Sequence, residues 1–184
     1  RLPQPNLAIT AYRVFSALFS APNTSAFNTS FLAATLKRLE GVTPNVLDVD
    51  LTKEYILMIS RAYRLLFIVD PSQIQAHLAR AVELLLPYFT EESEKITVTT
   101  KQALIEVIDQ GFTQELIEEA VEFDSGAEDE ENRPTVHQVL AHLSKAVNYK
   151  NRSNLDLILE VYAELFRKLG VHAAVLLSDA LASM

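Results

Sequence analysis

The sequence contains no cysteine, no tryptophan and only four glycines among its 184 residues. Without cysteine the chain cannot form a disulfide, a thiol nucleophile or a thiolate metal site, and an intracellular compartment fits best. The glycines stand singly at 41, 111, 126 and 170, so there is no glycine-rich loop of the kind that holds phosphate. No apolar run approaches the roughly 18 residues of a membrane span, and we expect no contact with a membrane.

Histidine is also scarce, and its spacing does not indicate a metal site. His137 and His142 are five residues apart, which places them about 140° from each other around a helix rather than on one face. The motifs of serine hydrolases and zinc proteases are absent as well. We therefore predict that the segment is not an enzyme and binds no cofactor or metal.

Acidic residues outnumber basic ones by 24 to 16, which gives a formal net charge of -8. Modules that bind nucleic acid usually show the opposite balance. Much of the excess is local, and we predict that residues 124–134 form an acidic, flexible loop. Such a run is ordinarily a solvated surface segment; a calcium loop would need a ligand where Gly126 stands. Ser125, three residues before Glu128, matches the pattern of an acidophilic kinase and is a candidate phosphorylation site.

Basic residues occur in small groups, and one of them is a candidate contact with a partner or with RNA. Lys145, Lys150 and Arg152 follow one another near the end of a predicted helix and the turn after it. Solenoids often present such turns to partners, and lysine and arginine can neutralise phosphate. The alternative is that a residue such as Lys150 complements the dipole at the helix C-terminus.

Helical periodicity is the strongest pattern in the chain. The first predicted helix has an apolar stripe that we expect to be buried, and it consists of Leu7, Ala11, Val14, Phe15 and Leu18. Asp70 and Pro71 predict the start of another helix, and Thr113 predicts the cap of a short one. Near the C-terminus, Ser153 or Asn154 would cap a long helix that Gly170 ends. In this helix we expect Leu159 to be buried, so that Leu159→Asp would unfold the last helix pair.

Helices at this spacing predict an all-α fold, an α-solenoid of HEAT-like antiparallel helix pairs. Each pair buries its apolar face by stacking on the next. The pattern continues to the last residues, and we expect residues 1–184 to be a single segment of a longer helical-repeat array, with the remainder of its own chain as one of its partners. Arrays of this kind offer broad surfaces, which favours scaffolding over catalysis.

The second half of the chain resembles the ribosomal RNA-processing protein 12 family, whose members are long nucleolar HEAT-repeat proteins. The resemblance lies in the helix 136–149, the aliphatic and aromatic helix 155–169, the break at Gly170 and the closing residues 181–184. The segments 55–78 and 99–117 are similar in pattern too.

The resemblance implies a non-enzymatic scaffold in biogenesis of the small ribosomal subunit. Such a protein would act in pre-ribosomal RNA maturation and in export of pre-ribosomal particles, in the nucleolus and nucleus. Its expected partners are proteins of those particles and, as a further candidate, pre-ribosomal RNA. The alternative is a karyopherin-like transport receptor or another HEAT-type adaptor subunit, which would share the architecture.

Overall fold

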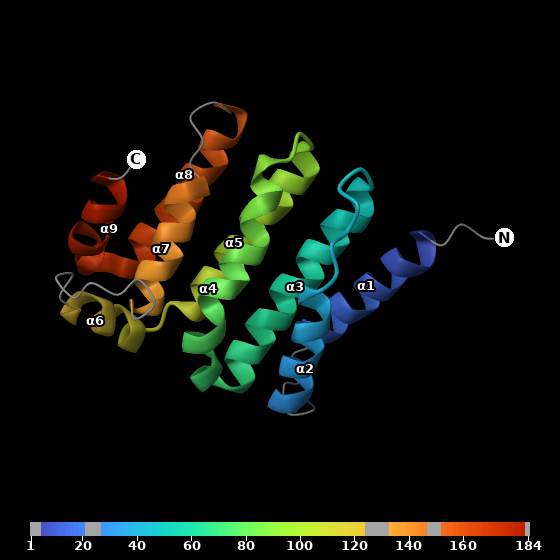
Figure 1. Cartoon of the computed structure of the whole chain (residues 1–184), viewed down its shortest axis with the longest axis horizontal. Coiled ribbons are helices and arrows are strands. Elements are labelled where there is room, and N and C mark those ends of the chain that lie inside the picture. Colours follow the sequence, from blue (N-terminus) through green and yellow to red (C-terminus); the bar gives the residue numbers. More distant parts are fainter. Residues whose placement is uncertain (1–4, 21–26, 124–132, 147–151, 183–184) are drawn as a thin grey trace.

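The predicted all-α architecture is confirmed by the computed structural model, which describes residues 5–20, 27–123, 133–146 and 152–182 (Figure 1). No strand occurs in these ranges. Short 3₁₀ turns cover Pro71–Gln73, Leu86–Thr90 and Gly170–His172. In chain order the α-helices are α1 (Pro5–Phe19), α2 (Thr29–Glu40), α3 (Val49–Val69), α4 (Ile74–Leu85), α5 (Glu94–Gly111), α6 (Gln114–Glu122), α7 (Thr135–Ala146), α8 (Arg152–Leu169) and α9 (Ala173–Ala182).

The helices form two layers, as expected of a HEAT-like solenoid. In the first layer α1 packs on α3, α3 on α5 and α5 on α8. In the second layer α4 packs on α7 and α7 on α9, while α2 rests on α3. Figure 1 shows the first layer running from the blue α1 on the right to the orange α8 on the left. The short α6 lies beside α7 and α9.

The local signals for helix ends are largely confirmed. The carboxylate of Asp70 accepts a hydrogen bond from the backbone N–H of Ser72 (3.2 Å), but Pro71 opens a 3₁₀ turn and α4 itself begins at Ile74. Thr113 caps α6 by accepting from the N–H of Leu116 (3.4 Å). Gly170 has φ of +53°, the left-handed conformation that commonly ends a helix. The start of α8 was predicted too late, because the helix already includes residue 152.

The β-branched cluster at the start of α5 is helical because its hydroxyl groups are satisfied within the helix. The Oγ1 of Thr99 donates to the carbonyl of Lys95 (2.7 Å), and that of Thr100 donates to the carbonyl of Ile96 (2.8 Å). Both threonines are buried. A buried hydroxyl without a partner would oppose folding, so these bonds allow the cluster to pack in the core.

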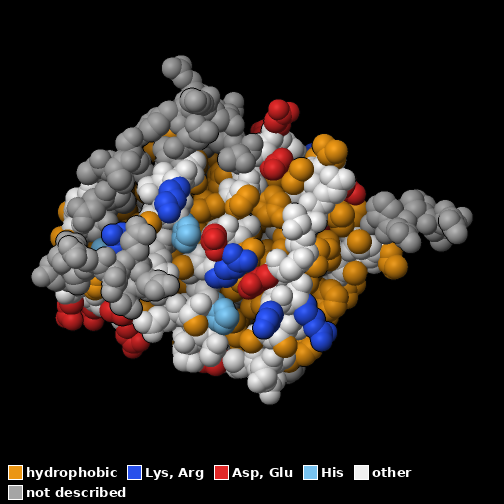
Figure 2. Space-filling view, in the orientation of Figure 1, with side chains coloured by type: hydrophobic (Ala, Val, Ile, Leu, Met, Phe, Trp, Pro, Cys, Tyr) orange, Lys and Arg blue, Asp and Glu red, His pale blue; other side chains and the backbone are white. Residues whose placement is uncertain are grey.

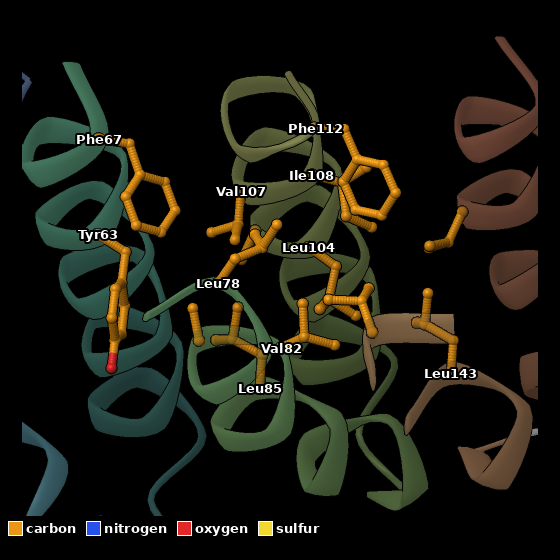
Figure 3. Packing of buried hydrophobic residues seen from close by; sticks show 14 of the residues in the cluster. Tyr63, Phe67, Leu78, Val82, Leu85, Leu104, Val107, Ile108, Phe112 and Leu143 are labelled. Atoms are coloured by element: carbon orange, nitrogen blue, oxygen red, sulfur yellow. The ribbon is translucent and has the colours of Figure 1, made fainter. Parts of the chain in front are cut away.

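One continuous apolar core runs through both layers. Figure 3 shows Leu78, Val82 and Leu85 of α4 directed between α3 and α5, where Tyr63 and Val107 approach from the two sides. Helix α3 contacts α1, α2, α4 and α5, as the wide apolar face of its sequence predicts. The core therefore passes from one repeat to the next without a break.

The predicted buried stripe of α1 is wrong. Leu7, Val14, Phe15 and Leu18 are exposed, and Leu7 retains 77% of its accessible surface. Tyr12 and Ser16 contact α3 instead, and Phe19 is buried in the core. The side chain of Ser16 is buried and accepts a hydrogen bond from Arg61 (2.5 Å), and the ring of Tyr12 meets that of Tyr55. Helix α1 thus has two apolar sides, and the more strongly apolar one faces outward.

Leu159 of α8 was also placed on the wrong face. It is 55% exposed, whereas Ile158, Val161 and Leu165 are buried. A charge at position 159 would therefore remain in contact with water, and the expectation that Leu159→Asp unfolds the last pair loses its basis. The last pair consists of α8 and α9, which are joined by the turn at Gly170.

Candidate interaction surfaces

The structure describes only part of the predicted basic group. Lys145 is exposed in the last turn of α7, and α8 begins at residue 152. Lys150 and the side chain of Arg152 lie outside the described residues. The common patch of Lys145, Lys150 and Arg152 remains a prediction; the structure shows only that α7 ends at Ala146 and that α8 begins at residue 152.

Ser125 and residues 124–132 of the acidic segment also lie outside the described residues, but the structure shows how the flanks of this segment are held. The ring of His137 lies 5.8 Å from that of Phe123, and its Nε2 is 2.9 Å from the carbonyl oxygen of Ala120. The carbonyl of Arg133 accepts from the side-chain amide of Gln138 (2.8 Å). Phe123 and Arg133, which flank the undescribed residues, are therefore each in contact with a side chain of α7, and His137 contributes to the contact between α6 and α7.

Ion pairs join α5 to α8 across the first layer. Lys168 and Arg167 place their side-chain nitrogens 2.7 and 3.0 Å from the carboxylate of Asp109, and Lys101 lies 2.6 Å from Glu160. The hydrogen bond from Lys168, together with the positive charges of Lys168 and Arg167, lowers the pKa of Asp109. Arg167 and Lys168 are thus engaged within the fold, which makes them poor candidates for phosphate contact.

A polar network that the sequence did not predict links α2, α3 and α4. The hydroxyl of Tyr63 donates to the carboxylate of Glu40, and Arg80 lies 3.6 Å from Glu40 and 2.6 Å from Glu83. Burial and the hydrogen bond to Glu40 raise the pKa of Tyr63. The partners are 23 and 40 residues apart in sequence, so only the packing of three helices brings them together.

Several exposed cations have no ion-pair partner among the described residues: Lys37, Arg38, Arg64, Lys95 and Lys145. Figure 2 shows lysine and arginine side chains in separate small groups on one face, with carboxylates between some of them. The carboxylates of α6, which include Glu115 and Glu122, are exposed at the edge of the molecule. The visible face thus has a mixed charge rather than one broad positive field.

An open groove lies between the N-terminal ends of α3 and α5. Its lining includes Asp48, Asp50, Glu94 and Lys95. Asp48 is already used as a helix cap, because its carboxylate accepts from the N–H of Leu51 (3.1 Å). The other two carboxylates stand in the first turns of their helices, where negative charge complements the helix dipole.

Two further kinds of functional element are absent from the described part of the chain. It contains no group of three or more histidine, aspartate or glutamate side chains placed to hold a metal ion. None of its helices has the combination of length and hydropathy that crossing a membrane requires.

A sequence profile of ribosomal RNA-processing protein 12, HEAT repeats, matches residues 90–184, which is just over half of the chain. The chain belongs to this family. The matched span begins at the end of the Leu86–Thr90 turn and includes α5 to α9, so that the ion pairs between α5 and α8 lie within it. The ribosomal RNA-processing protein 12 resemblance of residues 55–78 falls outside the matched span. No curated protein and no solved structure matches the chain significantly.

Membership of the ribosomal RNA-processing protein 12 family connects the chain with ribosome biogenesis. HEAT-repeat solenoids are typically non-catalytic, because their surfaces are built from the outer faces of repeated helices rather than around one enclosed pocket. The two-layer helical arrangement of this chain agrees with that general property.

Proposed function

We propose that this chain is a non-enzymatic scaffold section of a small-subunit assembly factor. It would act in maturation of pre-ribosomal RNA and in export of pre-ribosomal particles, in the nucleolus and nucleus. The observation that carries the proposal is the family match over α5 to α9. The two-layer solenoid supports it, since such a fold holds extended surfaces in fixed positions for large partners.

Protein contacts are the main binding mode in this proposal. The net charge of -8 and the mixed charge of the face shown in Figure 2 oppose broad, sequence-independent attraction to RNA. Proteins of pre-ribosomal particles are therefore the first expected partners. RNA contact is proposed only for the local basic group of Lys145, Lys150 and Arg152, where Lys145 is exposed and has no ion pair within the described residues.

The test is sedimentation of the tagged protein from cells through a sucrose gradient, with mass spectrometry and RNA sequencing of each fraction. The proposal predicts migration with small-subunit precursors that contain unprocessed ribosomal RNA. Migration in light fractions with import cargo would favour the transport-receptor alternative and overturn the proposal.

A charge-reversed variant tests the basic group in the same gradient. Lys145→Glu, Lys150→Glu and Arg152→Glu together should move the protein toward lighter fractions if these side chains contact phosphate. Lys37→Glu with Arg38→Glu is the matched control, because it reverses exposed cations at the end of another helix. Equal shifts for both variants would mean that the effect comes from general charge and not from this group.

Ser125 is proposed as a phosphorylation site within the acidic segment. Mass spectrometry of the particle-bound and free protein should detect phosphate at Ser125 in the wild type. The Ser125→Ala variant should carry no phosphate at position 125. Complete absence of phosphate from both pools of the wild-type protein would remove this part of the proposal.

A further inference from the structure

We draw no further inference here: the strongest candidate, the exposed apolar side of α1 formed by Leu7, Val14 and Leu18, carries nothing because nothing in the structure shows what covers it.

Discussion

At the scale of single residues, Gly111 allows α5 to pack directly against α4. A Cβ atom at this position would lie 2.4 Å from the Cδ1 of Leu78, a buried residue of α4. Gly111→Ala should therefore destabilise the protein by about 1–3 kcal/mol, because the clash exceeds the roughly 1 kcal/mol that alanine ordinarily adds to a helix. Urea denaturation measures the difference.

Gly41→Ala is the matched control for this prediction. Its added Cβ would meet only the carbonyl oxygen of Arg38 at 3.5 Å, and Gly41 has an ordinary right-handed conformation with φ of -78°. Its effect should be neutral or slightly stabilising. Equal destabilisation by both substitutions would show that contact with Leu78 is not the cause.

Tyr63 supports a prediction about alkaline pH. Its hydroxyl is buried and donates to Glu40, so its pKa is raised in the folded protein. A raised pKa contributes stability that is fully present below the unfolded value, about pH 10, and is lost as pH rises through the folded value. At neutral pH, Tyr63→Phe should lower the free energy of unfolding by about 1 kcal/mol, because the variant lacks the hydrogen bond to Glu40. Above about pH 10 the free energy of unfolding should fall less steeply in the variant than in the wild type.

Denaturation of both proteins at neutral and alkaline pH provides the measurement. Other tyrosines ionise in the same range, so the quantity to compare is the difference between variant and wild type. A difference that stays constant with pH would contradict the account given for Tyr63.

At the scale of elements, α8 has two faces whose substitutions should have different effects. Leu165 has no accessible surface and lies in the core, whereas Leu159 is largely exposed. Leu165→Ala should therefore destabilise the protein by about 2–5 kcal/mol, and Leu159→Ala by less than about 0.5 kcal/mol. Thermal or urea denaturation measures both. Equal losses would mean that α8 packs with a different face toward α5.

Helices α1 and α8 show where prediction from the sequence fails. Helical periodicity identifies an apolar stripe, but α1 and α8 each have two, and the sequence contains no indication of which stripe meets α3 or α5. On α1 the buried side includes the polar Ser16, whose role depends on Arg61, 45 residues away. Helix ends were predicted more accurately than buried faces. Thr113 and Gly170 mark helix ends as predicted, because capping depends only on nearby atoms.

Long-range polar contacts could not be predicted from the sequence either. The network of Tyr63, Glu40 and Arg80 joins three helices, and the pairing of Asp109 with Lys168 joins α5 to α8. Within its own helix, none of these residues has a sequence feature that sets it apart from other charged or aromatic residues. Their pairing follows from how the helices cross, which the periodicity of one helix does not determine.

At the scale of the whole molecule, the continuous core predicts one cooperative unfolding transition. Buried residues extend from Phe19 in α1 to Leu177 in α9 without a gap. Repeat proteins can unfold in stages when the contacts between repeats are weak, but the extensive contact of α3 with α5 argues against a division there. We therefore expect both halves of the chain to unfold at the same urea concentration.

Two probes can test this expectation. Tyrosine fluorescence reports mainly on the first half, where Tyr12, Tyr55, Tyr63 and Tyr88 lie. The chain has no cysteine, so Lys145→Cys provides a single attachment point for a fluorophore in the second half. Separate midpoints for the two probes would show that the chain contains two independently unfolding units.

The close approach at Gly111 also affects the shape of the array. Because position 111 has no side chain, the C-terminal end of α5 can lie directly against Leu78 of α4. In a solenoid each repeat takes its orientation from the one before, so the spacing of α4 and α5 bears on the orientation of the helices that follow. A single absent methyl group near the middle of the chain would thus help to set the curvature of the surface that a partner meets.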